Sequence, residues 1–253
     1  MNKDRTMSFF CSFFHSLRTQ LLVPLYPAMR NYVYAFLAFS AIMALVVPSV
    51  GCWFVPLAVA IYYFYRDPQR SVPQGAGFVV AHADGIIDRI EHGVLLPEEI
   101  RTTLPEDVQQ QSFVRISIYM SLLDNHIQRA PVAGVVEREI FVKGVYSNAQ
   151  QIEAAQRNER SLMALKTQEG EYIICSQIAG AISRVVVCQA FEGDALERGA
   201  RYGIIRFGCR AELFIPMDYA LLVSEGTNVR AGETMMAIHA DSCNMGALTW
   251  KIV

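Results

Sequence analysis

Charged side chains are scarce in this 253-residue sequence, at 18% against about 25% in an average soluble domain. The 22 Lys and Arg residues do not outnumber the 24 Asp and Glu residues, and the formal net charge is -2. Proteins that bind nucleic acid normally carry a basic face, so no nucleic-acid partner is expected. Low-complexity stretches are also absent, and a hydrophobic content of 53% excludes an intrinsically disordered chain.

Cysteine pairs at CxxC spacing are missing as well. The six cysteines are scattered, most of them in apolar runs: Cys11, Cys52, Cys175, Cys188, Cys209 and Cys243. This distribution is typical of free thiols in a reducing compartment and argues against a disulfide framework or a structural zinc site. The cysteines therefore predict no metal site.

The longest gap in charge lies between Arg30 and Arg66, where residues 31–65 contain no Asp, Glu, Lys or Arg. One transmembrane helix needs about 20 apolar residues, so this stretch is too long for a single ordinary span. Pro48 divides it into two apolar halves, each slightly short for a full crossing. We expect a membrane helical hairpin over 31–65, either spanning twice or entering one leaflet as a wedge; a buried hairpin of a soluble protein is the alternative.

Positive charge flanks the hairpin on both sides, with Arg18 and Arg30 before it and Arg66 and Arg70 after it. Because basic flanks stay in the cytoplasm, both ends of the hairpin are expected there. Residues 1–30 read as an amphipathic segment that lies on the membrane surface. The prediction is a protein of the cell (inner) membrane with its remaining residues on the cytoplasmic side.

Residues 71–253 hold most of the charge and read as short β-branched strands separated by turns. The expected strands are Phe78–Val80, Gly85–Ile90, Val114–Met120, Val132–Val142, Tyr172–Gln177, Ile182–Cys188, Tyr202–Phe207, Ala211–Ile215, Ala220–Val223 and Thr234–Ala237. Two Gly-containing turns with similar spacing suggest a mainly β, antiparallel domain like a barrel-sandwich hybrid. Such folds often carry a lipoyl or biotinyl group on a hairpin lysine, but the segment 232–237 has no lysine, so a carrier is excluded.

Four short segments contain side chains suited to chemistry. They are His82-Ala-Asp84-Gly85, Asp124 to Pro131 around His126 and Arg129, Arg206 to Arg210 around Cys209, and His239-Ala-Asp241. Each has an ordinary structural explanation when taken alone. Asp-Gly is a common turn, and a single Cys is often a small buried hydrophobic residue.

Together these segments resemble the phosphatidylserine decarboxylase proenzymes, specifically their short, membrane-associated form. The most specific part is the block from Arg201 to Arg210, in which Tyr-Gly-Ile-Ile-Arg-Phe-Gly is followed by one nucleophilic residue and Arg. The weaker parts are Tyr65 to Pro68, Ala83 to Gly85, Asn125-His126, Arg129 to Pro131, Gln177 to Gly180 and Gly232 to Thr234. The resemblance covers most of residues 30–237 and implies a β decarboxylase domain over 71–253.

The resemblance implies that the chain cuts itself between residues 208 and 209 and converts residue 209 into a pyruvoyl cofactor. The usual Ser is replaced here by Cys209, after Gly208. Pieces 1–208 and 209–253 would remain together as a heterodimer, and the pyruvoyl carbonyl would form a Schiff base with the serine amine of the membrane phospholipid substrate before CO₂ leaves. His126 is expected to act as a base, with Asp84 orienting it.

The resemblance leaves the roles of His126 and Arg129 open. Longer family members have a second His where this chain has Arg129. Either His126 serves both self-cleavage and decarboxylation, or Arg129 holds the lipid phosphate or carboxylate. His82 lies off the family motif and is interpreted as part of the surroundings.

Two other functions are weighed against this one. A zinc hydrolase would use His82, Asp84, His126 and His239 as ligands, but the chain has no HExxH or similarly compact spacing. A membrane-tethered relic would keep the decarboxylase fold without maturing, because Cys replaces Ser. The favoured prediction is decarboxylation of phosphatidylserine to phosphatidylethanolamine.

Overall fold

The computed structural model describes residues 23–146, 157–180, 185–206, 210–240 and 249–253. The chain divides into two compact units, with the division between Gln69 and Arg70.

The first unit contains a pair of helices, α2 (Arg30–Val46) and α3 (Pro48–Phe64). The helices approach closely near their connection, where a Cβ atom on Gly51 would lie 2.2 Å from the Cα atom of Ala44. Farther along, the Phe54 ring packs against two rings of α2 at centroid distances of 5.8 and 6.4 Å. The uncharged stretch therefore folds as two helices joined at Val47, immediately before Pro48.

Many apolar side chains of this helical pair are exposed, including Leu45 at 83% and Trp53 at 78%. Within the described ranges, no helix is both long enough and apolar enough to cross a bilayer. The expected helical hairpin is thus present as helices, and its insertion into a membrane stays a prediction.

The second unit is mainly β, as expected. Its strands are β1 (Ser71–Gln74), β2 (Phe78–Val80), β3 (Gly85–Val94), β4 (Phe113–Tyr119), β5 (Ile127–Arg129), β6 (Gly134–Val142), β7 (Arg160–Lys166), β8 (Tyr172–Ile178), β9 (Val185–Cys188), β10 (Ala195–Leu196), β11 (Arg201–Arg206), β12 (Arg210–Pro216), β13 (Tyr219–Leu221), β14 (Asn228–Val229), β15 (Met235–His239) and β16 (Thr249–Ile252). Two short helices, α4 (Glu98–Arg101) and α5 (Glu106–Gln110), lie between β3 and β4.

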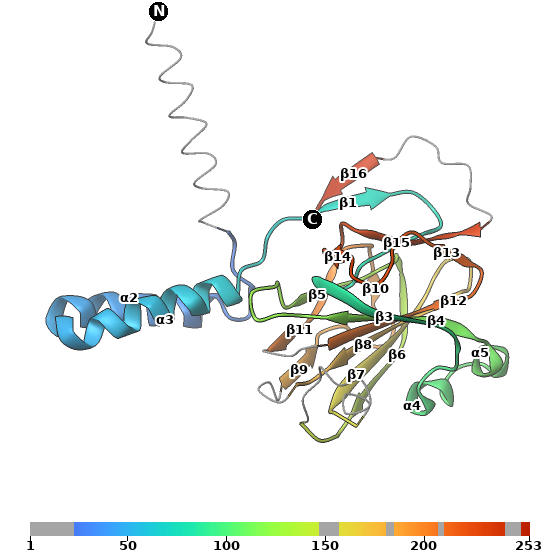
Figure 1. The fold of residues 1–253 in the computed structure, drawn as a ribbon, viewed down its shortest axis with the longest axis horizontal. Coiled ribbons are helices and arrows are strands. Elements are labelled where there is room, and N and C mark those ends of the chain that lie inside the picture. Colours follow the sequence, from blue (N-terminus) through green and yellow to red (C-terminus); the bar gives the residue numbers. More distant parts are fainter. Residues whose placement is uncertain (1–22, 147–156, 181–184, 207–209, 241–248) are drawn as a thin grey trace, which may run out of the picture. The chain divides into compact units, whose positions relative to one another are not determined.

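The strands form one large antiparallel sheet and three small ones. The eight-stranded sheet has the order β10-β6-β7-β8-β12-β4-β3-β14, and it curls around its interior (Figure 1). The small sheets are β5-β11-β9, β13-β15-β2 and β1-β16. Strand β12 is central, because it pairs with β8 on one side and with β4 on the other.

Apolar side chains of these sheets form the main core, which includes Ile116 and Ile118 of β4 and Leu213 and Ile215 of β12. A second cluster packs Ile100 and Val108, from the two short helices, against Phe113 and Phe214. Successive side chains of β12 point to opposite faces of the sheet, so one face of this strand is buried in each cluster.

The structure also corrects several sequence-based boundaries. Strand β7 (Arg160–Lys166) was not among the expected strands, and residues 147–156 before it lie outside the described residues. Strands β1, β5, β10, β14 and β16 were not expected. Most of these are very short or pair at an edge, so their residues show little alternation to detect.

Candidate active site

The predicted site residues lie on chain segments that are hydrogen-bonded to one another. The Arg129 amide at the end of β5 donates to the His82 carbonyl at 2.9 Å. The Gly232 amide donates to the Ala81 carbonyl at 2.7 Å. The segment that carries His82 and Asp84 therefore runs between β5 and the residues that follow β14.

Asp84 is almost fully buried and has two strong partners. The Arg70 guanidinium donates to its Oδ2 atom at 2.6 Å, and the Ala231 amide donates to its Oδ1 atom at 2.7 Å. Removal from water raises the pKa of the Asp84 carboxyl, and the nearby Arg70 cation partly offsets this rise. The sequence analysis missed Arg70 as a partner because 14 residues separate it from Asp84.

His126 is fully buried immediately before β5. Its Nδ1 atom lies 2.9 Å from the Asp124 carbonyl oxygen, which only accepts hydrogen bonds. Nδ1 therefore carries the proton and Nε2 is the basic atom of the neutral ring. Among the described contacts, the Asp124 carbonyl orients this ring, whereas the Asp84 carboxylate bonds to Arg70 and Ala231.

Strand β5 places His126 beside the strand that leads into the predicted cleavage position. Ile127 pairs with Ile204 of β11, and the Ile205 amide donates to the His126 carbonyl at 3.1 Å. Gly208 and Cys209 themselves lie outside the described residues. Their sequence neighbour Arg206 ends β11, one residue beyond the pairing with His126.

Arg210, directly after Cys209, is anchored in the core of the large sheet. Its guanidinium is fully buried and forms a bidentate pair with Asp88, at 3.0 and 2.5 Å. Its backbone pairs with Tyr119 on one side and Ile178 on the other. Residues 207–209 thus connect the three-stranded sheet of β11 to the eight-stranded sheet of β12.

Arg129 is also fully buried, with its Nη1 atom 3.0 Å from the Gly199 carbonyl and 3.5 Å from that of Val253. Its assignment to the substrate stays a prediction.

The interior beside β5 and β11 is more polar than a simple core. Its buried polar side chains include His82, Gln128 and Gln177, and Gln177 Oε1 has no hydrogen-bond partner among the described residues. Burial lowers the pKa of His82 to about 3, so its ring is neutral at physiological pH. Buried polar groups are costly to take out of water, and their concentration is typical of a functional interior.

Two other cysteines within the described residues are poorly suited to nucleophilic chemistry. Cys175 is fully buried, which raises its thiol pKa strongly, and burial raises the pKa of Cys188 to about 11. The thiolate is the reactive form, so both side chains are inert at neutral pH.

The ligand set expected for a zinc hydrolase does not converge. Among the described residues, one group of three or more His, Cys, Asp or Glu donors lies within ligand distance, and it consists of Glu171, Asp218 and His239. His82, Asp84 and His126 are not part of it. The hydrolase prediction is therefore wrong in its ligands.

Comparison with known proteins agrees with the motifs in the site. The model of the phosphatidylserine decarboxylase family matches residues 57–237. A phosphatidylserine decarboxylase proenzyme of Ruegeria pomeroyi is 36% identical over 221 residues, which cover 87% of this chain and 98% of the relative. Proenzymes of the same name from Neorickettsia sennetsu and Wolbachia pipientis are 35% and 33% identical, and each match covers 83% of this chain. These two matches cover 89% and 91% of the respective relatives.

Proposed function

Because this chain belongs to the phosphatidylserine decarboxylase family, we propose that it decarboxylates phosphatidylserine to phosphatidylethanolamine after cutting itself between Gly208 and Cys209. The pairing of β5 with β11 carries the proposal, since it holds the His126 backbone against the strand that runs into this bond. The activity makes the protein an enzyme of phospholipid biosynthesis and the uncut chain its zymogen.

The family depends on a pyruvoyl group, and the described residues around β5 and β11 suit one. They supply the buried neutral imidazole of His82 and the buried amides of Gln128 and Gln177. When present, the group supplies a carbonyl that withdraws electrons from the carbon that loses CO₂. Deriving this group from Cys209 instead of Ser is part of the proposal.

Self-cleavage begins with His126, whose Nε2 atom accepts the Cys209 thiol proton. The sulfur then attacks the Gly208 carbonyl carbon, and the amide nitrogen leaves as the amine of residue 209, giving a thioester. Loss of the Cα proton breaks the Cβ–S bond. The first piece is released with a terminal thiocarboxylate, and residue 209 becomes dehydroalanine, which tautomerises and is hydrolysed to pyruvoyl and ammonia.

In the mature enzyme, His126 is proposed to return a proton to the carbon that has lost CO₂. Arg129 is proposed to bind the phosphate or the carboxylate of the lipid, because a buried guanidinium suits both anions. Asp84 is proposed to assist self-cleavage. It lies two residues after His82, whose carbonyl accepts a hydrogen bond from the Arg129 amide. An Arg129→Gln variant is expected to cleave itself and to show a raised KM for phosphatidylserine.

The two pieces are proposed to stay together as a heterodimer. In the described part of 209–253, β12 pairs with β4 and β8, β14 with β3, β15 with β2 and β16 with β1. Every one of these partner strands lies in 1–208. The cut pieces are therefore expected to co-elute under native conditions and to separate in denaturant.

We further propose that α2 and α3 insert into the cell (inner) membrane and that the β unit works on its cytoplasmic side. Support comes from the uncharged residues 31–65 and from exposed side chains such as Leu45 and Trp53. Flotation with phosphatidylserine vesicles tests this. A Leu45→Asp/Trp53→Asp variant should float less than the unchanged protein, and equal flotation contradicts insertion through this helical pair.

Intact-mass measurement of the purified protein tests the self-cleavage. We expect pieces 1–208 and 209–253, with a pyruvoyl terminus on the second. Before hydrolysis, the first piece should be about 16 Da heavier than its carboxylate form, because sulfur replaces oxygen. A single unbroken chain that stays uncut and inactive would support the non-maturing relic instead.

Three variants sharpen this test. Cys209→Ala removes the nucleophile and should give only the uncut chain. Cys209→Ser should still cleave and release a first piece without the added sulfur mass. Cys188→Ala is the matched control, since the half-buried Cys188 thiol lies in β9 beside β11 and should be dispensable for cleavage.

A further inference from the structure

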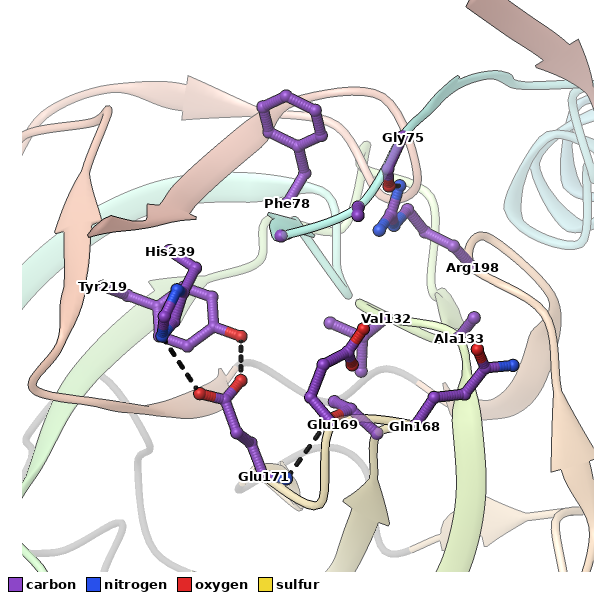
Figure 2. A pocket seen from close by; sticks show the side chains of 13 residues that line it. Gly75, Phe78, Val132, Ala133, Gln168, Glu169, Glu171, Arg198, Tyr219 and His239 are labelled. Atoms are coloured by element: carbon purple, nitrogen blue, oxygen red, sulfur yellow. Dashed lines mark hydrogen bonds and ion pairs between the residues drawn. The ribbon is translucent and has the colours of Figure 1, made fainter. Parts of the chain in front are cut away.

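A second cluster of chemically active side chains lies where the turn before β8 meets β13 and β15. Figure 2 shows Glu171, Tyr219 and His239 pointing toward one another beside a cavity. The His239 Nε2 atom lies 3.2 Å from Glu171 Oε1 and 3.3 Å from Asp218 Oδ2. Three separate elements therefore bring one imidazole and two carboxylates together.

The spacing of these donors matches that of ligands around one small cation. Bonds from zinc to His nitrogen or carboxylate oxygen are about 2.0–2.2 Å, which puts neighbouring ligands of a tetrahedral site about 3.3–3.6 Å apart. The two separations measured from His239 Nε2 agree with this within about 0.1 Å. One oxygen each from Glu171 and Asp218 and the His239 nitrogen all lie within 4.8 Å of one another.

The surroundings hold these donors in place. The Tyr219 hydroxyl donates to Glu171 Oε2, the oxygen that does not face His239. Tyr219 and His239 are also directly paired across β13 and β15, and their rings meet edge to face at 5.1 Å. Hydrogen bonds of this kind orient the ligands of metal sites and fix which oxygen faces the ion.

The charge of the cluster also favours a cation. Among the described residues, no Arg or Lys forms an ion pair with Glu171 or Asp218, and Glu169 adds a third carboxylate to the cavity lining. The one cationic side chain in that lining, Arg198, donates from Nη1 to the carbonyls of Pro73 and Gly75. The carboxylates of Glu171 and Asp218 thus face His239, and that of Glu171 also borders the cavity.

The cavity gives such an ion room for a further ligand. Its volume is about 270 Å³, and its lining includes Glu171, Tyr219 and His239. Three protein ligands and one open position are the pattern of zinc sites that bind water or a small ligand.

We propose that Glu171, Asp218 and His239 bind one divalent transition-metal ion of the zinc class. The sequence singled out His239 but not Glu171 or Asp218, because the three ligands are far apart in the chain and lack compact spacing. Glu171 belongs to 1–208, whereas Asp218 and His239 belong to 209–253. If the proposed self-cleavage takes place, the ion therefore links the two pieces of the mature protein.

Metal binding is measured on the purified full chain after treatment with a chelator. Equilibrium dialysis against Zn²⁺ should give one saturable equivalent per chain, and Co²⁺ should give the intense visible bands of tetrahedral coordination. At a free Zn²⁺ concentration 100-fold above Kd, the thermal midpoint should rise by about 5 °C or more. None of these readouts depends on activity, so the site can fail while the proposed function holds, and the reverse.

The variants distinguish this site from surface binding. His239→Gln and Asp218→Asn each remove one ligand and should abolish the saturable equivalent and the Co²⁺ bands. Tyr219→Phe removes only the hydrogen bond to Glu171 and should weaken binding by about 10-fold. The control is His92→Gln, an exposed histidine on β3, which should bind Zn²⁺ like the unchanged protein.

Two results would overturn the proposal. One is the absence of a saturable equivalent in the unchanged chain. The other is retention of that equivalent, with unchanged affinity, in folded His239→Gln and Asp218→Asn proteins. Either would leave the cluster as a hydrogen-bonded His–carboxylate contact.

Discussion

Replacing Arg70 by Met removes the cation that faces the Asp84 carboxylate. The side chain of Asp84 is 12% exposed and lies 2.6 Å from Arg70, so the pair is shielded from solvent. Breaking a buried ion pair by removing one partner typically costs about 3–5 kcal/mol. Asp84 keeps its hydrogen bond from the Ala231 amide, so we expect a loss near the lower end, about 3 kcal/mol in the free energy of unfolding.

The pH dependence of this loss follows from the direction of the Asp84 pKa. Burial already raises that pKa, and Arg70 holds it down, so the Arg70→Met substitution raises it further. A carboxyl with a raised pKa in the folded state loses stability as the pH rises above its unfolded value. The deficit of Arg70→Met should therefore be largest near pH 8 and smaller near pH 5.

Thermal unfolding of the full chain in a Cys209→Ala background measures this without interference from cleavage. A loss of about 3 kcal/mol predicts a midpoint lower by about 6–12 °C. Arg89→Met is the matched control, because the Arg89 side chain is 47% exposed and lies 3.9 Å from Glu91, and it should lose about 0.5 kcal/mol or less. A deficit no larger than that of the control, or one that does not shrink at pH 5, would show that Arg70 does not stabilise the Asp84 carboxylate.

Three further predictions concern the interior and the turns. His82 is fully buried and its pKa is lowered to about 3. The folded state therefore favours the neutral ring, and the free energy of unfolding falls as the pH decreases from 6.5 toward 3. Chemical denaturation should detect about 2 kcal/mol of this loss between pH 8 and pH 5, and a His82→Phe chain that unfolds with the same pH dependence would contradict it. Gly85→Ala should destabilise by more than about 2 kcal/mol, because φ is +149° and the added Cβ would lie 2.2 Å from the Tyr119 carbonyl oxygen. Gly193→Ala, at φ +90° with open space around it, should cost less in the same denaturation assay. Asp88→Asn weakens the anchor of Arg210 beside the cleavage position and should slow the appearance of cut pieces on a gel, while Asp107→Asn on α5 should not.

Sequence reasoning located much of the fold and the segments of the site, but not their partners. The β-branched runs gave β2, β3, β4, β8 and β12, because alternation and burial follow directly from those residues. The motifs also singled out Asp84, His126 and Arg129, which the structure links through β5. Arg70 and Asp88 were missed because their importance comes from long-range contacts with Asp84 and Arg210.

The sequence singled out His239, but its contacts with Glu171 and Asp218 were missed for the same reason. The three residues lie in a turn, before a short strand and at a strand end, where local patterns carry little information. The pairing of β13 with β15 brings two of them together, and neither strand shows a period long enough to predict that register.

The central position of β12 bears on why one polypeptide carries both parts of the enzyme. Without β12, strands β4 and β8 would expose unpaired backbone edges, which favour aggregation. Two separately synthesised pieces would have to meet by diffusion before these exposed edges caused aggregation. A continuous chain supplies β12 at a high effective concentration and in a fixed one-to-one ratio, so the sheet closes before the proposed scission takes place.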